Sequence, residues 1–153
     1  MNRQLSGWGR TPVVPGYEAR GEHLEPLTDG VPLTRGLGRA YGDAALPAPG
    51  DTRIAGCALA DRILHFDRQS GTLTAEAGLS VDSLYRSLLP LGWFTPVTPG
   101  TRFVTLGGMV AADVHGKNHH VDGTFGRHVT ALRLRTGTGD IVACSRTEQV
   151  GHV

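Results

Sequence analysis

The strongest hydrophobic pattern in the chain lies between residues 80 and 92 and predicts an α-helix. Apolar side chains recur there at spacings of three and four residues, which places them on one face of a helix. The stripe consists of Val81, Leu84, Tyr85, Leu88 and Leu89. Ser80 is a suitable N-cap, and Leu79 is placed to form a hydrophobic staple with Leu84. Pro90 and Gly92 end the periodic segment, so we expect a short helix that packs its apolar face on a sheet.

Shorter alternating runs predict strands in the middle and near the end of the chain. The predicted strands are Val31–Thr34, Arg53–Ala58, the pair Arg62–Asp67 and Thr72–Ala77, and the pair Thr130–Thr136 and Ile141–Ser145. Turns at Arg68–Gly71 and Gly137–Asp140 would join the two pairs as hairpins. A second, shorter helix is predicted after Thr105 and through Ala112, where small side chains let the backbone approach a neighbour. Together these elements predict an α+β fold with two small subdomains, the first rich in strands and the second with helices on an antiparallel sheet.

Residues 1–30 carry no comparable pattern. Three prolines and five glycines interrupt this segment and leave room for at most a short helix near Glu22–Thr28. We therefore predict an amino-terminal arm over residues 1–30, followed by one domain over residues 31–153.

Composition narrows the functional classes. The chain has 153 residues, 15 basic and 14 acidic side chains, and a net charge of +1. The basic residues are spread along the chain, which disfavours binding to nucleic acid. The amino terminus lacks a signal-peptide pattern, and no apolar run reaches the roughly 18 residues of a membrane span, so we expect a soluble, cytoplasmic chain. Cys57 and Cys144 match no metal or redox spacing and are expected to be reduced thiols.

Glycine accounts for 22 residues, and one cluster of them could bind an anion. The segment Arg35–Asp43, RGLGRAYGD, offers consecutive backbone N–H groups that can converge on a phosphate, and Arg35 and Arg39 would add charged donors. The segment lacks the lysine of a P-loop, departs from the G-x-G-x-x-G spacing and leads into no helix. A purely structural turn is therefore the alternative.

A second glycine cluster begins about sixty residues later. Thr98-Pro99-Gly100-Thr101 and Thr105-Leu106-Gly107-Gly108 offer threonine hydroxyls, backbone amides and the amino end of a predicted helix. Close packing of that helix against a strand at its two glycines is the alternative explanation. The two clusters could together hold the ends of one extended ligand.

The segment Asp113–His128, DVHGKNHHVDGTFGRH, holds four of the seven histidines. A metal site would use His115 and His119 or His120, with Asp113 or Asp122, but the spacing matches no named zinc motif. The adjacent His119 and His120 would also point in different directions on a helix or a strand. We favour polar groups that line the pocket of an organic cofactor, or hydrogen-bonded histidines of a tight loop, over a metal site.

In this order, TRGLGRAYGD, TPVTPGTRFVTLGG and DVHGKNHHVDGTFG resemble the flavin-binding half of the vanillyl-alcohol-oxidase-type FAD oxidoreductases. The resemblance is most specific to the decaprenylphosphoryl-β-D-ribose 2′-oxidase-like branch, and LSGWGRT near the amino terminus also fits. It implies an FAD-binding fold of the PCMH type. It also implies oxidation of a sugar or alditol hydroxyl to a carbonyl, in which flavin takes a hydride and a side chain takes the hydroxyl proton.

The resemblance assigns both clusters to FAD, the first to its diphosphate and the second to its phosphate, ribityl and ring-edge region. The implied cofactor-binding residues are Arg35, Gly36, Leu37, Gly38, Arg39, Ala40, Tyr41, Gly42, Pro99, Gly100, Thr101, Thr105, Gly107, Gly108, Ala112 and His115. Many relatives attach the flavin covalently through a histidine at the position that matches Arg39, so we expect non-covalent FAD here. Ala40 stands where this branch commonly has serine, which removes one hydroxyl.

The implied catalytic residues are His115, beside the isoalloxazine, Lys117, facing the substrate, and Tyr41 nearby. For Lys117, a solvated surface lysine is the alternative. The best-known members act on a sugar phosphate linked to a polyprenyl chain, a substrate that would draw a cytoplasmic protein to the membrane surface. They also imply a reductase partner, as in the polyprenyl-phospho-ribose epimerase system.

Relatives of this family continue for hundreds of residues, so the resemblance implies that the chain is incomplete at its carboxyl end. The substrate-cap domain and the glycine-rich segment that supports the adenine side would be absent. Two other hypotheses remain open at this point. One is a non-catalytic fragment that binds FAD, and the other is a metal-binding protein built on His115, His119 and His120.

Overall fold

The first part of the chain forms a four-stranded sheet from segments far apart in sequence. The computed structural model describes residues 3–51 and 53–146. The elements are β1 (Arg3–Ser6), β2 (Val13–Arg20), α1 (Leu24–Leu27), β3 (Thr34–Arg35) and β4 (Arg53–Gly56). The strand order is β1-β2-β4-β3, in which β1 pairs with β2 antiparallel and β4 pairs with both β2 and β3 in parallel. Leu5, Leu46 and Ile54 form the buried core of this first lobe, residues 3–56.

The two strands of residues 1–30 were not predicted. The short helix expected there is present as α1, but the expectation of no further regular structure is wrong. Burial alternates along β2 from Val13 to Glu18, but the more buried positions include Gly16 and Glu18, and Pro15 lies inside the strand, so the local sequence shows no hydrophobic alternation that would predict it. Tyr17 pairs with Arg53 and Arg20 with Gly56, which means that the strand forms against a segment much later in the chain.

The second lobe, residues 57–146, combines helices with two hairpins. It contains η1 (Cys57–Leu59), β5 (Ile63–Phe66), β6 (Leu73–Ala75), α2 (Val81–Leu88), η2 (Leu89–Leu91), α3 (Leu106–Ala111), α4 (His119–Asp122), η3 (Phe125–His128), β7 (Ala131–Arg135) and β8 (Ile141–Ser145). β5 pairs with β6 and β7 with β8, both antiparallel, as the alternating runs predicted. The architecture is therefore α+β, with a second lobe of the expected kind.

The helix α2 confirms the strongest sequence pattern. The Ser80 hydroxyl accepts a hydrogen bond from the Ser83 N–H at the amino end. Val81, Leu84 and Leu88 are buried, and the last two share a core cluster with Leu79, as expected of a hydrophobic staple. Leu89 departs from the predicted stripe because the α-helix ends before it and its side chain is 51% exposed. Gly92, with φ 82°, then takes the left-handed conformation that ends the helical segment.

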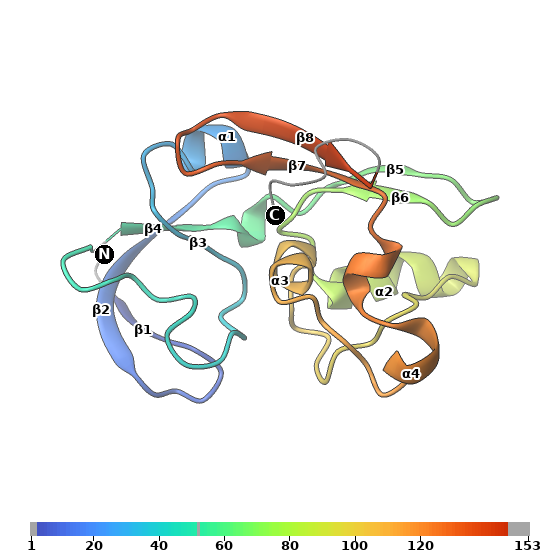
Figure 1. The fold of residues 1–153 in the computed structure, drawn as a ribbon, viewed down its shortest axis with the longest axis horizontal. Coiled ribbons are helices and arrows are strands. Elements are labelled where there is room, and N and C mark those ends of the chain that lie inside the picture. The colour runs from blue at the N-terminus through green and yellow to red at the C-terminus, as the bar shows by residue number, and fades with distance from the viewer. Residues whose placement is uncertain (1–2, 52, 147–153) are drawn as a thin grey trace.

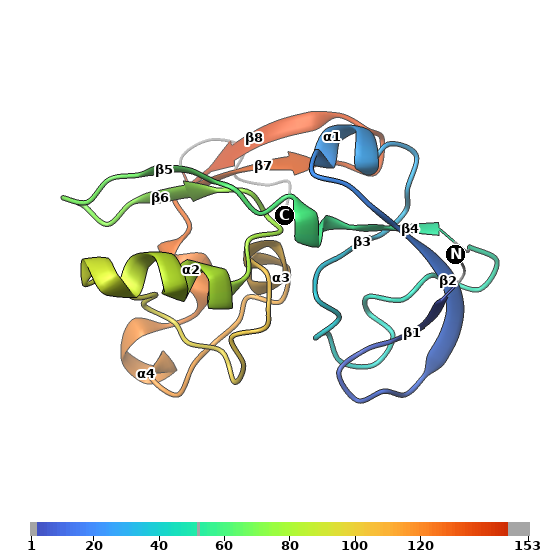
Figure 2. The same cartoon turned by 180° about the vertical axis from the view of Figure 1, so that it is seen from behind.

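The two lobes lie side by side, and the hairpin β7–β8 reaches from the second lobe across to α1 of the first (Figures 1 and 2). The chain passes between the lobes at η1, which contacts both β2 and β3. The loop after β3 and the helix α3 lie on the facing sides of the lobes in both views. Among the described residues, no helix is long and apolar enough to cross a bilayer.

Candidate functional site

The loop that follows β3 presents backbone donors without acceptors. In the part of the chain that the structure describes, none of the N–H groups from Leu37 to Ala45 donates to a protein atom. Gly38 and Gly42 have φ angles of 68° and 57°, which side chains with a Cβ rarely adopt. A left-handed glycine between ordinary residues turns successive N–H groups toward one side, so this loop has the features of an anion-binding nest.

Arg35 holds this loop in place and does not point its donors outward. Its guanidinium donates to the carbonyl oxygen of Ser6 at 2.6 Å and to that of Ala45 at 2.9 Å. The residue is 9% exposed, and burial lowers the pKa of its guanidinium. A Cβ on Gly38 would lie 2.2 Å from Arg35 Nη2. Arg35 therefore fastens both ends of the loop to β1, and the expectation that it donates to a phosphate has no support in this geometry.

Arg39 is the exposed cation of the same loop. Its Nη1 lies 2.5 Å from the carbonyl oxygen of Leu37, and its guanidinium carbon lies 5.6 Å from the centre of the Trp8 ring. The Trp8 N–H donates to the Ala40 carbonyl at 2.9 Å, so the turn between β1 and β2 stabilises the loop. A Cβ on Gly7 would lie 2.6 Å from that same carbonyl oxygen. The glycine clusters do not point to Trp8 as a support, although Trp8 lies in the motif LSGWGRT, which fits the family resemblance.

The amino end of α3 uses its backbone donors inside the protein. The N–H groups of Leu106 and Gly107 donate to the carbonyls of Leu79 and Ala77, at 2.9 and 2.8 Å. The Gly108 N–H donates to the hydroxyl of Thr105, a buried N-cap with 2% exposure. The expectation that this helix end offers free amides to a phosphate is therefore wrong. Close packing, the alternative given by the sequence, explains Gly107, whose Cβ would lie 3.0 Å from Ala77 Cβ.

The segment before α3, residues 98–101, has free backbone donors instead. Across the described residues, the N–H groups of Thr98, Gly100 and Thr101 have no protein acceptor, and a Cβ on Gly100 would meet nothing within 4 Å. An open depression of about 420 Å³ lies between α2 and this segment. Its lining includes Tyr85 and Phe94, whose rings stack with centroids 4.5 Å apart. No residue of the first loop or of the histidine segment lines this depression, so it does not by itself join the three segments.

The histidine segment packs on the segment before α3 through Gly116 and Asn118. A Cβ on Gly116 would lie 2.9 Å from the Thr98 carbonyl oxygen. The Asn118 amide nitrogen donates to the Pro96 carbonyl at 2.8 Å and to an Asp122 carboxylate oxygen at 2.6 Å. This leaves the buried Oδ1 of Asn118 without a donor within the described residues. No sequence pattern singles out this acceptor, because it becomes buried only through tertiary contacts.

The histidine rings cluster at the surface. The ring centroids of His119 and His120 are 3.9 Å apart, and those of His115 and His119 are 5.6 Å apart, so the expectation that adjacent histidines diverge is wrong here. The two adjacent residues occupy one short turn, α4, where their rings can fold onto each other. Within the described residues, no group of three or more histidine, cysteine, aspartate or glutamate side chains could hold a metal. His115 and Lys117 are exposed.

The structure brings the first loop to the second cluster at one point of close contact. A Cβ on Gly36 would lie 2.4 Å from the Thr105 hydroxyl oxygen, so the loop and the start of α3 touch there. Ala112, at the end of α3, is exposed. Tyr41 is 80% exposed, and among the described residues we find no hydrogen bond or ring contact that joins it to His115 or Lys117. The three motifs are therefore linked in a chain, through Gly36 and Thr105 and then through Thr98 and Gly116.

Comparisons with known proteins agree on one family. The model of the FAD binding domain matches residues 29–145. A decaprenylphosphoryl-beta-D-ribose oxidase from Mycolicibacterium smegmatis is 36% identical over 149 residues, which cover 91% of this chain and 32% of that protein. An L-gulonolactone oxidase from Scyliorhinus torazame is 33% identical over 89 residues, or 57% of this chain and 20% of that protein.

A solved structure shows the same fold. An alkyldihydroxyacetonephosphate synthase superposes with a TM-score of 0.68 at 18% identity, covering 84% of this chain and 26% of its own. At that identity the likeness concerns the fold alone. The chain spans about a third of the length of the ribose oxidase and a smaller share of the other two proteins.

Proposed function

The chain belongs to the FAD-binding domain family of oxidoreductases, and we propose that it holds FAD non-covalently for the oxidation of a hydroxyl group on a sugar or alditol. Within this class we propose a sugar linked to a polyprenyl phosphate as the substrate. The similarity to the ribose oxidase, which extends over 91% of this chain, supports that choice.

The run of free amides in the first loop is the observation that carries the proposal. Successive N–H groups from Leu37 onward have no acceptor within the described residues, and such donors suit the negative charge of a diphosphate. Arg39 is exposed beside them and adds a cation to the same loop. Residues 37–42 therefore fit the diphosphate of FAD, with Arg35 and Trp8 as the supports that hold the loop.

The second cluster and the histidine segment fit the rest of the cofactor. Thr98, Gly100 and Thr101 offer free N–H groups at an open surface, and the unpaired Oδ1 of Asn118 is an acceptor that a bound group could satisfy. Gly108 is exposed and gives α3 a surface without a side chain, so it can let a flat ring approach the helix even though its amide is already bonded. Its proposed role is therefore one of shape, whereas the proposed role of Gly107 is to let α3 pack closely on Ala77.

Non-covalent binding follows from the residue at position 39. An arginine guanidinium has no ring nitrogen that could form the bond to flavin that a histidine forms. Arg39 instead is expected to bind the diphosphate electrostatically. We therefore expect FAD to be released when the protein is unfolded and filtered.

The proposed chemistry divides between cofactor and protein. Bound FAD supplies the hydride acceptor. The protein binds the substrate and fixes the position of the carbon that is to be oxidised. A side chain takes the proton from the hydroxyl oxygen on that carbon. His115 and Tyr41 are the candidates for this side chain, and both are exposed, as is Lys117, so all three are free to meet a substrate. We assign Lys117 to the phosphate of the substrate because its ammonium is a compact cation.

Titration of the purified chain with FAD tests the proposal. We expect saturable binding with one FAD per chain, followed as quenching of flavin fluorescence, and weaker binding in Arg39→Gln. Absence of FAD binding by the folded chain would contradict the cofactor role. If FAD binds, anaerobic addition of a short prenyl-phosphoryl pentose should bleach the flavin absorbance. Retained absorbance would instead favour a fragment that binds FAD without oxidising the substrate.

A further inference from the structure

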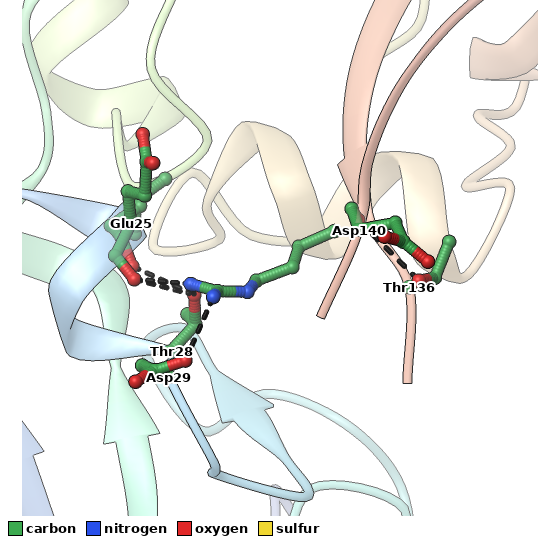
Figure 3. Close-up of polar contacts among 7 residues, drawn as sticks. Glu25, Thr28, Asp29, Thr136 and Asp140 are labelled. Atoms are coloured by element: carbon green, nitrogen blue, oxygen red, sulfur yellow. Dashed lines mark hydrogen bonds and ion pairs between the residues drawn. The ribbon is translucent and has the colours of Figure 1, made fainter. Parts of the chain in front are cut away.

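A single side chain of β7 reaches from the second lobe to the end of α1 in the first lobe. Arg135 Nη2 lies 2.9 Å from the Asp29 carboxylate, and its Nη1 lies 3.2 Å from the Thr28 hydroxyl and also donates to the Glu25 carbonyl. Figure 3 shows these contacts converging on the end of α1. The partners are separated from Arg135 by more than a hundred residues of sequence, so the contact joins two distant parts of the fold.

The geometry at Arg135 is suited to a guanidinium. The Thr28 hydroxyl already donates to the Leu24 carbonyl at 2.8 Å, so its oxygen is oriented to accept a hydrogen bond from Arg135. The side chain of Arg135 is 22% exposed, which restricts its alternative positions, whereas that of Asp29 is 77% exposed. Two terminal nitrogens in a rigid plane can serve a carbonyl, a hydroxyl and a carboxylate together, and a lysine ammonium on a flexible stem cannot match that arrangement.

The turn after β7 holds Arg135 in position. The Thr136 N–H donates to the Asp140 carbonyl at 2.9 Å, and Figure 3 shows these two residues side by side. The Thr138 hydroxyl donates to the Asp140 carboxylate at 2.8 Å. Arg135 also pairs with Ile141 at the end of the ladder between β7 and β8. Because the hairpin end is fixed, the guanidinium acts from a defined point of the second lobe.

Other contacts between the lobes lie at the chain crossing, where η1 contacts β2 and β3. The other four ion pairs found among the described residues each join two side chains of the same lobe. The lobes meet covalently at η1 and by close approach where Gly36 faces Thr105. Arg135 is the last residue of β7, and the hairpin β7–β8 spans both lobes in Figures 1 and 2. It therefore adds a point of attachment that is distant from the chain crossing.

We propose that Arg135 is a positioning residue that fixes the distance between the two lobes and thereby between the two FAD-binding segments. The first loop belongs to one lobe, and α3 and the histidine segment belong to the other. A ligand held by both requires them at one separation, and a contact that favours this separation in the free protein lowers the cost of binding. The expected effect on FAD binding rests on the proposed function, whereas the expected effect of Arg135 on the separation of the lobes does not.

Arg135→Gln tests the inference, with Arg133→Gln as the matched control. Arg133 lies on the same strand and face, is exposed, and makes no hydrogen bond or ion pair that we find within the described residues. Amide hydrogen exchange of the FAD-free chain is measured first. In R135Q we expect faster exchange at residues 24–29 and at the contact of Gly36 with Thr105, and in R133Q we expect the pattern of the unchanged protein.

FAD titration of the same variants gives the second readout. We expect R135Q to weaken FAD binding by about tenfold, the order expected for loss of charged hydrogen bonds, and R133Q to change it by less than twofold. Arg135→Lys should recover part of the affinity, and Asp29→Asn should lose less than R135Q because the bonds to Glu25 and Thr28 remain. A smaller effect of R135Q than of D29N would contradict the assigned geometry.

The outcomes separate the two proposals. If the unchanged chain does not bind FAD, the proposed function fails, and hydrogen exchange alone decides whether Arg135 holds the lobes. If it binds FAD and R135Q binds equally well, the positioning role fails and the proposed function stands. Unchanged exchange at Gly36 and Thr105 in R135Q also overturns the positioning role, whatever the affinity.

Discussion

The two glycine clusters have similar compositions but use their backbone amides in different ways. From Leu37 to Ala45 the N–H groups find no acceptor among the described residues, whereas those of Leu106, Gly107 and Gly108 all donate within the protein. The first cluster is an irregular loop fastened by Arg35, whereas the second half of the second cluster begins a helix capped by Thr105. A glycine pattern therefore indicates a close approach of the backbone, but not whether its donors are available to a ligand.

The difference has a physical cause. A helix start leaves its first N–H groups without helical partners, and in α3 these groups meet the carbonyls of Ala77 and Leu79 from the link between β6 and α2. The groups that hydrogen-bond the loop after β3, the Arg35 guanidinium and the Trp8 N–H, are themselves donors and bind its carbonyls. Donors in the loop therefore stay free, and those at the helix are satisfied.

The largest effect is expected from Gly38→Ala. A Cβ at this left-handed position would also displace Arg35 from its two carbonyls, so we expect a loss of about 2 to 3 kcal/mol in unfolding free energy and strongly reduced FAD binding. Gly137→Ala is the control, because its Cβ would meet nothing within 4 Å, its φ is not positive, and it lies outside the proposed FAD site. Urea unfolding and FAD titration measure both variants. Equal effects of the two substitutions would mean that Gly38 is not constrained as described.

A comparison of Arg35 with Arg39 separates the residue that supports the loop from the residue that is proposed to bind FAD. Arg35→Gln removes the donors to the Ser6 and Ala45 carbonyls, and we expect a loss of about 2 kcal/mol in stability. Arg39→Gln should leave stability within about 0.5 kcal/mol, because the residue is exposed, and should weaken FAD binding in a salt-dependent way. Urea unfolding and FAD titration, each at low and at high salt, measure these effects. An Arg39→Gln variant with normal FAD affinity would remove this residue from the site.

The second cluster is tested with its two helical glycines. Gly107→Ala would crowd Ala77, and we expect a stability loss of about 1 kcal/mol. Gly108 is exposed, and its Cβ would lie a tight 3.3 Å from the Thr105 hydroxyl, so this crowding should offset the higher helix propensity of alanine and leave stability within about 0.5 kcal/mol in Gly108→Ala. We expect it to weaken FAD binding severalfold, since the added methyl would occupy space beside α3. Unchanged affinity would show that this face of α3 does not meet the cofactor.

The smallest effect is expected from Glu76 and concerns the pH dependence of stability. The Glu76 side chain bonds Arg62, which lowers its pKa from 4.5 to about 2. Because the pKa is lower in the folded than in the unfolded state, this contact stabilises the fold above pH 4.5 and is lost as the pH falls toward 2. Urea unfolding between pH 6 and pH 3 should show a shallower decline in Glu76→Gln than in the unchanged protein. The exposed carboxylate Asp51 provides a control, and Asp51→Asn should keep the original slope.

Much of the second lobe was predictable because its elements depend on neighbours in sequence. The cap at Ser80, the stripe of α2 and the hairpins β5–β6 and β7–β8 follow from local spacing and turn residues. The family resemblance depended on three motifs in order, and the match to the FAD binding domain over residues 29–145 confirms it. The residue roles implied by the resemblance stay predictions.

The sequence by itself determined the family, the α+β class, the helix at residues 81–88 and the position of the glycine clusters, because local periodicity and motif order are written along the chain. The tertiary structure decided the parallel pairing of β2 with β4, the bonding of the α3 amides, the inward turn of Arg35 and the reach of Arg135 to α1. Each of these joins groups that are distant in sequence, and which donor meets which acceptor is fixed only when the chain has packed.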